Sequence, residues 1–236
     1  MEECIAKQRL NVILLVDASK SMSGSRIKQV DAAIKDIKEY LIDLETENSN
    51  VDFYITLIPF NNFATFYNNK EMVKIDNFKY DGIKTGGWSN LHLAYEKLGE
   101  ILQKESKGGV MPDFGGLAPI ILLLTDGHPT GKAYKDVLKS LENSPWYQTA
   151  LRYGIAIEMD DVITSKVLHD FVKNNGDVIQ CLDASKLKEI IKIIVITASK
   201  VKSQSNNVSY DLNKTSNMIV QQNIAEALSD LDNLEW

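Results

Sequence analysis

Residues 10–21 read Leu-Asn-Val-Ile-Leu-Leu-Val-Asp-Ala-Ser-Lys-Ser. The first seven are almost continuously apolar and rich in branched side chains, which is typical of a central parallel strand that is buried on both faces. The apolar run stops at Asp17, where small polar residues begin. From Ile27 to Leu41 apolar residues recur at intervals of three or four, which indicates a helix with one buried stripe. This stretch therefore predicts a buried strand, a polar turn and a helix in succession.

Strands and helices continue to alternate along the rest of the chain. Residues 51–57 alternate between apolar and other side chains, and Ile120–Leu124 is a second strongly apolar strand. The further elements expected are a hairpin or edge strand within 63–80, helices near 91–102, 131–142 and 162–174, strands near 151–157 and 178–182, and a last helix from about 184. This order predicts an α/β fold, with a doubly wound, mostly parallel sheet, helices on both faces and one antiparallel edge strand.

Oxygen-bearing side chains follow the ends of the two most apolar strands. Asp17 begins the pattern Asp-x-Ser-x-Ser with Ser19 and Ser21, Asp126 follows the second strand, and a separate glycine-containing loop supplies Ser89. In open α/β sheets, ligands bind beyond the carboxyl ends of the strands. Carboxylates and hydroxyls are hard oxygen donors that suit Mg²⁺. We therefore predict that these five residues form a divalent-metal site.

This constellation resembles the metal-ion-dependent adhesion site (MIDAS) of von Willebrand factor A (vWA) domains, and the resemblance covers roughly residues 8–200. The family pattern is Asp-x-Ser-x-Ser, then a Thr or Ser on a later loop, then an Asp after a hydrophobic strand, and all three parts occur here in that order. The chain departs from many members in having Ser89 in place of Thr, and Trp88 in place of a small residue. The resemblance implies the Rossmann-like vWA fold.

The resemblance also implies a role for each site residue. Ser19 and Ser21 are expected to bind the metal directly, Ser89 to do so in at least one state, and Asp17 and Asp126 to act partly through water. The implied metal is Mg²⁺, or another divalent cation such as Mn²⁺ or Ca²⁺, and a partner protein supplies a Glu or Asp as the remaining ligand. Because few protein charges touch it directly, the cation stays electrophilic toward that carboxylate. The implied function is a protein-binding module and not an enzyme.

Within the family, residues 124–130 and 153–157 look most like bacterial cytoplasmic members associated with tellurium resistance and stress operons. This narrower resemblance implies work beside stress-response partners. The N-terminal residues begin with two acids and no apolar run precedes the first strand, which predicts that there is no signal peptide and that the protein is cytoplasmic. The run Leu10–Val16 is too short to span a bilayer, so no association with a membrane is expected.

Composition excludes several other classes of function. A hydrophobic content of 44% is enough for a core, and a formal charge of −6 argues against nucleic acid as a partner because phosphates need a positive surface. Cys4 and Cys181 lie in no Cys-x-x-Cys or Cys/His cluster, so we expect neither a zinc site nor a disulfide framework.

Lys20 and Arg26 are suited to attract an acidic partner, although simple solvation is the plainer interpretation of isolated charges.

The composition of the sequence changes near residue 200. We expect a vWA domain over residues 1–201, and a polar linker with a short acidic amphipathic helix or tail over 202–236. Residues 203–217 are rich in Ser and Asn, and 216–236 contain four acids with no Lys or Arg. The terminal segment is open to three interpretations: a docking element that mediates self-association, a helix packed on its own domain, or a disordered tail.

Two alternatives to a binding module remain at this point. Asp17 is placed like the phosphoryl acceptor of a Mg²⁺-dependent phosphotransferase or phosphatase of the haloacid-dehalogenase type, but such enzymes usually have a second Asp where this chain has Ser19. The second alternative is a scaffold with a vestigial metal site. Nucleotide binding is not favoured, because the chain has neither a P-loop nor a Gly-x-Gly-x-x-Gly motif after its first strand. His128 beside Asp126 is interpreted as a solvated loop residue.

Overall fold

The computed structural model describes residues 7–47, 50–69, 71–114, 116–127, 129–131, 133–159, 166–173, 176–181, 184–204, 218–219, 222–224 and 226. Its sheet has the strand order β3-β2-β1-β4-β5-β6. The strands are β1 (Gln8–Asp17), β2 (Val51–Phe60), β3 (Val73–Lys74), β4 (Ile120–Thr125), β5 (Leu151–Ile157) and β6 (Gly176–Cys181). All neighbours pair in parallel except β2 and β3, which are antiparallel. The predicted α/β class, the mostly parallel sheet and the antiparallel edge strand are confirmed.

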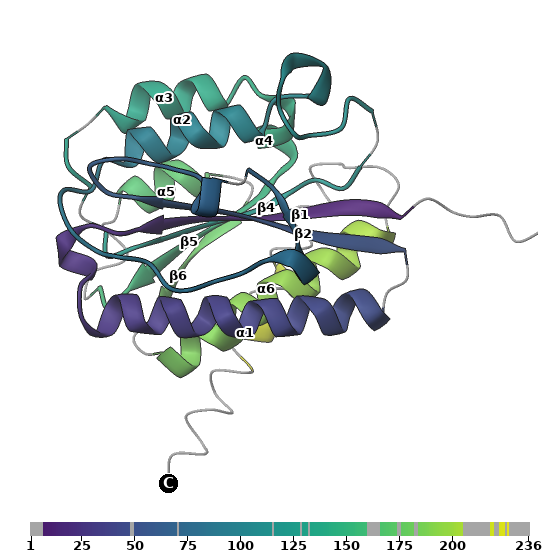
Figure 1. The fold of residues 1–236 in the computed structure, drawn as a ribbon, viewed down its shortest axis with the longest axis horizontal. Coiled ribbons are helices and arrows are strands. Elements are labelled where there is room, and N and C mark those ends of the chain that lie inside the picture. The colour runs from purple at the N-terminus through teal and green to yellow at the C-terminus, as the bar shows by residue number, and fades with distance from the viewer. Residues whose placement is uncertain are drawn as a thin grey trace, which may run out of the picture.

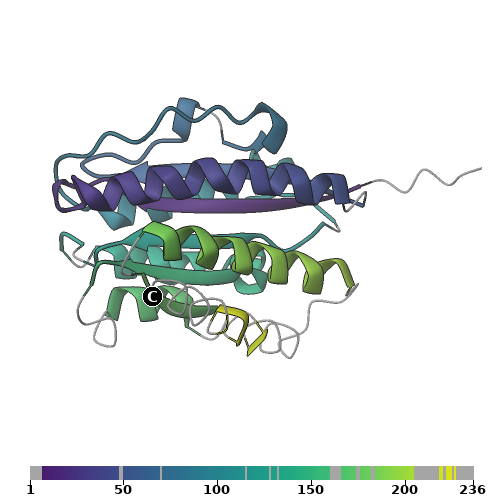
Figure 2. The same cartoon turned by 90° about the horizontal axis from the view of Figure 1, so that it is seen from below.

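Helices cover both faces of the sheet (Figure 1). One face carries α1 (Ser25–Glu47) and α6 (Ala184–Gln204), which lie side by side in Figure 2. The other face carries α2 (Leu91–Ile101), α3 (Tyr134–Leu141), α4 (Pro145–Thr149) and α5 (Lys166–Val172). Short 3-10 turns occur at Lys20–Met22, Tyr67–Asn69, Ile75–Asn77 and Glu105–Lys107.

The central strand β1 joins the two halves of the core. Val12, Leu14 and Val16 point into the cluster beneath α1 and α6, whereas Ile13 and Leu15 point into the cluster beneath the other helices. All five are completely buried, which explains why the sequence is apolar on both faces of this strand. The polar turn that follows β1 is therefore anchored to the most buried strand of the sheet.

The edges of the fold differ from the sequence prediction. The helix expected at 131–142 begins at Tyr134, and the helix expected at 162–174 spans Lys166–Val172 among the described residues. The strand expected at 178–182 begins earlier, at Gly176. Gly176 and Asp177 pair with β5 although neither is apolar, because an edge strand tolerates polar residues. A hydrophobic pattern alone could not locate these ends.

The domain boundary expected at residue 201 falls inside a helix. α6 continues to Gln204, past the expected domain boundary. Ile224 is buried in the same core cluster as α6, and Asn223 donates a hydrogen bond to the Thr197 hydroxyl over 3.2 Å. This part of the C-terminal segment packs on its own domain, as one of the three interpretations expected, and the residues after Glu226 lie outside the described part. In the portion that the structure describes, no helix is both long and apolar enough to cross a membrane.

Candidate functional site

The topology brings two of the predicted site residues to one edge of the sheet. β1 and β4 are parallel neighbours, with Val16 opposite Leu124, so Asp17 lies across from Thr125 and Asp126 follows directly at the carboxyl end of β4. The helix that follows β1 covers one face of the sheet and the helix that follows β4 covers the other. This is the switch point at which open α/β sheets form ligand crevices. Asp17 is 0% exposed and Asp126 is 1% exposed.

Three donors converge on the carboxylate of Asp17. The backbone N–H of Ser19 donates to Oδ1 over 2.9 Å, and the hydroxyls of Ser89 and Thr125 each donate to Oδ2 over 2.8 Å. Thr125 in turn accepts a hydrogen bond from the N–H of Gly127 over 3.0 Å. Sequence reasoning missed Thr125, although its position at the end of an apolar strand, directly before Asp126, was a usable signal. The carboxylate is thus fixed by three different segments of the chain.

The two serines of the Asp17 turn form a pair. Ser19 Oγ and Ser21 Oγ are 3.0 Å apart. Magnesium binds oxygen at about 2.1 Å in an octahedron, which puts adjacent ligand oxygens about 3.0 Å apart. The spacing of the two hydroxyls therefore fits one edge of a magnesium shell. Both serines and Ser89 line an open pocket of about 520 Å³, together with Lys20 and Trp88.

Arg26 links the fifth predicted residue, Asp126, to this turn. Its Nη1 lies 3.2 Å from Asp126 Oδ2 and also donates to the backbone oxygen of Ser21 over 3.1 Å. Its Nε lies 3.2 Å from Glu158 Oε2. The interpretation of Arg26 as a solvated charge is therefore wrong, because its guanidinium is held between two carboxylates. Asp126 carries a fixed cationic neighbour that the metal-site pattern does not predict.

The loop that carries Ser89 is tied to the Asp17 turn through backbone hydrogen bonds. Gly86 N–H donates to Ala18 O over 2.8 Å, and Lys20 N–H donates to Gly87 O over 3.1 Å. Gly87 has φ +75°, and a Cβ there would lie 2.6 Å from the side-chain oxygen of Asn62. Only glycine meets both demands without strain, so the paired glycines allow the loop to pass close enough to place Ser89 on Asp17.

Burial raises the pKa of Asp17 above its usual value, against the lowering effect of the hydrogen bonds from Ser19, Thr125 and Ser89. The folded protein thus disfavours the ionised carboxylate when no cation is near. The protonated carboxyl group of Asp17 contributes its full share of stability to the folded protein below the unfolded-state pKa. This contribution is lost as the pH rises through the raised folded-state pKa.

Asp17→Asn removes this penalty and keeps a side chain of the same shape. In EDTA, we expect the variant to become more stable relative to the wild type as the pH rises from about 4 to 7. Urea denaturation across this range measures the difference in the free energy of unfolding. Excess Mg²⁺ at pH 7 should raise the free energy of unfolding of the wild type relative to that of Asp17→Asn, because a cation stabilises the ionised carboxylate. A difference that does not change with pH would contradict this account.

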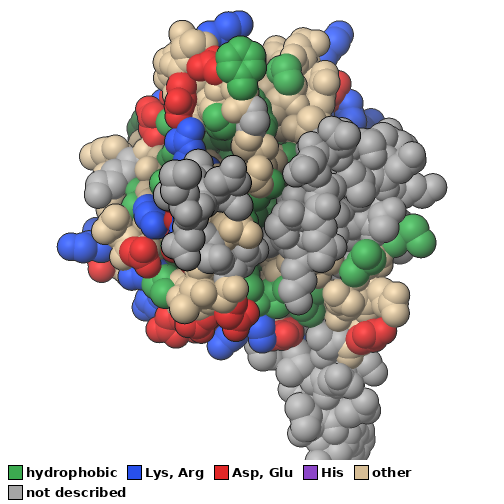
Figure 3. Space-filling model, turned by 90° about the vertical axis from the view of Figure 1, so that its right-hand side faces the viewer, with side chains coloured by type: hydrophobic (Ala, Val, Ile, Leu, Met, Phe, Trp, Pro, Cys, Tyr) green, Lys and Arg blue, Asp and Glu red, His purple; other side chains and the backbone are tan. Residues whose placement is uncertain are grey.

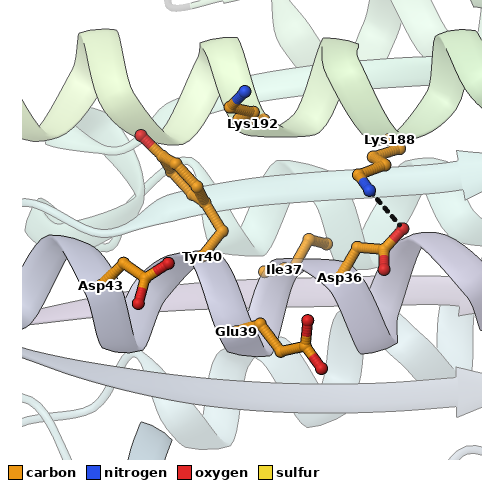
Figure 4. Close-up of a pocket in the computed structure, with 7 residues that line it drawn as sticks. All are labelled: Asp36, Ile37, Glu39, Tyr40, Asp43, Lys188 and Lys192. Carbon is orange, nitrogen blue, oxygen red and sulfur yellow. Dashed lines mark ion pairs between the residues drawn. The ribbon is translucent and has the colours of Figure 1, made fainter.

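A second hollow, of about 230 Å³, lies between α1 and α6 on a helical face of the domain (Figure 4). Both lysines of the hollow have partners in its wall: Lys188 pairs with Asp36 over 3.1 Å, and Lys192 lies 5.5 Å from the centre of the Tyr40 ring. Negative charge from Glu47, Glu189 and Asp43 adds to burial in raising the pKa of Tyr40 to about 12. Although acidic residues line this hollow, they are not among any group of three or more that the described part of the chain places to hold a metal, so the carboxyl edge of the sheet remains the candidate site.

The described residues contain no group of three or more His, Cys, Asp or Glu side chains placed to hold a metal. The candidate site differs from such a group because three of its five predicted members are serines. Asp17, Ser19, Ser21 and Ser89 come together in the structure, and Asp126 is joined to them through Arg26. His128 lies outside the described residues.

Comparison with known proteins gives consistent results for the fold. The sequence profile of the von Willebrand factor type A domain matches residues 11–193. The inter-alpha-trypsin inhibitor heavy chain H1 of Sus scrofa is 29% identical over 133 residues, which are 53% of this chain and 14% of that protein. This chain therefore corresponds to a small part of that relative.

Two solved structures share the architecture. A von Willebrand factor type A protein from Catenulispora acidiphila has a TM-score of 0.58 at 13% identity, over 82% of this chain and 43% of its own. BatB from Bacteroides thetaiotaomicron has a TM-score of 0.52 at 12% identity, over 81% of this chain and 99% of its own. At these identities the likeness shows the fold alone. The relatives are varied, so they do not favour the narrower resemblance to tellurium-resistance proteins.

Proposed function

The chain belongs to the von Willebrand factor type A domain family, and from this premise we propose that it binds a divalent cation at the Asp17 turn and uses it to grip a carboxylate of a partner protein. Domains of this family are generally protein-binding modules without catalytic activity. The observation that carries the proposal is the convergence of two hydroxyls and one backbone N–H on one buried carboxylate, beside a pair of serine hydroxyls, Ser19 Oγ and Ser21 Oγ, that lie 3.0 Å apart. Mg²⁺ is the cation that this oxygen set fits best, with Mn²⁺ or Ca²⁺ as substitutes.

The geometry gives little support to the phosphotransfer alternative. Both oxygens of Asp17 accept hydrogen bonds, and the residue is completely buried, so its carboxylate is poorly placed to attack a phosphate ester. Ser19 also stands where such an enzyme usually has its second Asp. A scaffold whose site binds no metal is the remaining alternative, and metal titration separates it from the proposal. A cytoplasmic stress-response role is a further, narrower part of the proposal that rests only on the sequence resemblance.

A serine exchange tests the proposal with little disturbance of the core. We expect Ser19→Ala combined with Ser21→Ala to remove Mn²⁺ binding by the purified chain, measured by calorimetry or electron paramagnetic resonance, because both hydroxyls of the octahedral edge are lost. The same variant should lose Mg²⁺-dependent, EDTA-sensitive recovery of partners from a lysate. Ser23→Ala is the matched control, because Ser23 lies in the same turn but bonds to Thr85 instead of lining the pocket.

Two results would count against the proposal. Wild-type protein that takes up no Mn²⁺ would favour the vestigial scaffold. Partner recovery that is equal in Mg²⁺ and EDTA would exclude a cation bridge, even if the metal binds. Hydrolysis of a generic phosphate ester by the wild type, lost in Asp17→Asn, would instead revive the enzymatic alternative.

A further inference from the structure

We propose that an aromatic rim beside the candidate metal site selects partner acids that have a large apolar side chain close to them in sequence. The rim consists of Trp88 and Phe63. This inference rests on the proposed function and adds to it the chemical class of the partner: an acidic residue with a Leu, Ile, Phe, Tyr or Trp within a few positions.

The first observation is the exposure of the two rim residues. Trp88 is 69% exposed and Phe63 is 73% exposed. Aromatic side chains of this size normally bury most of their surface, and exposed ones that gather around a polar site indicate a binding surface. Trp88 directly precedes Ser89, so it stands at the edge of the candidate metal site.

The second observation is that hydrogen bonds fix the backbone at both rim residues. The Trp88 N–H donates to the side-chain oxygen of Asn62 over 2.8 Å, and the Phe63 N–H donates to the side-chain oxygen of Asn61 over 3.2 Å. The Asn90 N–H then donates to the backbone oxygen of Asn61 over 3.1 Å. Two loops from different parts of the chain are thus joined through neighbouring asparagines. Because the backbone of the rim is fixed in this way, the two loops lose little backbone freedom when a partner binds.

The third observation is a pair of hollows that both reach the turn at residues 18–21. The first, of about 520 Å³, contains the site serines and Trp88. The second, of about 340 Å³, is lined by Phe63, Tyr67 and Ile83 and reaches Ala18, the residue before Ser19. Both volumes are in the range of pockets that hold small ligands. When an acidic residue of a partner enters the first hollow, an apolar side chain close to it in sequence can therefore reach the second hollow.

Charge favours an acidic partner at the same place. Lys20 lines the first hollow and Lys84 lines the second, although the chain as a whole has a formal charge of −6. Local positive charge speeds encounter with acidic segments and opposes basic ones. A partner that combines an acid with an apolar neighbour matches both the charge and the aromatic surface.

The opposite end of the molecule provides a matched control. Figure 3 views the end at which the parallel strands begin, where acidic and basic side chains are intermixed and hydrophobic side chains gather near the top. Phe114 lies in the loop before β4, at this end, and is 91% exposed. It also has a cationic neighbour, because Lys104 Nζ lies 5.4 Å from its ring centre. Like the rim, Phe114 is therefore an exposed aromatic residue near a lysine, but it lies at the opposite end of β4 from the candidate site.

Selection from a library of displayed random peptides tests the inference. The full chain is immobilised in Mg²⁺, and peptides that EDTA elutes are sequenced. We expect enrichment of Glu or Asp together with a large apolar residue within about three positions. In Phe63→Ala with Trp88→Ala, the acid should remain enriched and the apolar residue should not. A selected peptide should bind this variant about tenfold more weakly, since burial of a large apolar side chain is worth at least that factor.

The outcomes distinguish the inference from the function on which it rests. Peptides enriched in acids alone would overturn the aromatic rim and leave the metal-bridged function intact. An apolar preference that survives in the double variant, or that Phe114→Ala removes equally, would also overturn the rim. No EDTA-eluted peptides with an enriched acid would overturn the proposed function, and the rim with it. Circular dichroism confirms that each variant is folded, as expected for changes at exposed positions.

Discussion

Replacing Arg152 with methionine is expected to lower the free energy of unfolding by about 3 kcal/mol or more. Arg152 lies in β5 and is only 4% exposed. Its guanidinium donates to three backbone oxygens: those of Phe171 over 2.9 Å, Tyr147 over 2.6 Å and Val172 over 3.0 Å. It also lies 4.3 Å from the centre of the Tyr147 ring. The residue thus joins the sheet to α4 and to the end of α5.

The size of this effect follows from what methionine leaves behind. Burial lowers the pKa of Arg152, so the buried charge is costly and is tolerated because carbonyls surround it. Met fills much of the same space but donates no hydrogen bond, and each lost bond to a charged group contributes about 1.5–3 kcal/mol. The carbonyls at the end of α5 also lose a cation that suits the negative end of a helix.

Urea denaturation measures the effect, and Arg9→Met is the control. Arg9 lies in β1 and pairs with Glu105 over 2.6 Å, but both side chains are substantially exposed, so its removal should cost less than about 1 kcal/mol. Equal losses in the two variants would show that the buried contacts of Arg152 add nothing beyond those of a surface ion pair.

Arg152 also shows where sequence reasoning reaches its limit. The central strands β1 and β4 are buried on both faces, so their sequences are continuously apolar and their positions could be predicted. β5 was predicted too, although it contains an arginine, because its other residues are apolar. Nothing local indicated that the arginine points inward, since its three acceptors come from other elements. The polar start of β6 at Gly176 and Asp177 was missed for a related reason, because it is defined by pairing and not by burial.

The candidate site divides in the same way. Asp17, Ser19 and Ser21 occupy one short turn, so their spacing alone suggested shared chemistry. Ser89 and Asp126 were added through the order of motifs and the rule that parallel strands end at one edge. The contact of Arg26 with Asp126 spans 100 positions of sequence and joins a helix start to the end of another strand. No periodicity or motif encodes such a contact, so only the structure revealed the cation beside the site.

Replacing Arg26 with methionine is expected to destabilise the protein in EDTA by about 1–3 kcal/mol and to increase its affinity for Mg²⁺ by about tenfold. The loss of stability arises because Asp126 is buried and loses the guanidinium 3.2 Å away. It is smaller than for Arg152 because the Arg26 side chain is 29% exposed. The gain in affinity arises because a divalent cation no longer competes with a fixed positive charge beside Asp126.

Two further variants separate charge from shape. Arg26→Lys keeps the positive charge, so its Mg²⁺ affinity should stay near that of the wild type. Glu158→Gln removes the other carboxylate that holds Arg26 and leaves the pairing with Asp126 in place, so it should change Mg²⁺ affinity much less than Arg26→Met does. Calorimetric titration with Mg²⁺ measures the affinities, and thermal unfolding in EDTA or excess Mg²⁺ measures the stabilities.

One experiment can measure both effects of Arg26→Met, the change in stability and the change in Mg²⁺ affinity, because ligand binding and stability are linked. A cation that binds only the folded state stabilises it by an amount that grows with concentration over the dissociation constant. Saturating Mg²⁺ should therefore raise the stability of Arg26→Met more than that of the wild type, and the deficit seen in EDTA should shrink by about 1.4 kcal/mol for a tenfold gain in affinity. If Mg²⁺ instead stabilises the variant less than the wild type, the guanidinium positions Asp126 for the cation and does not oppose it.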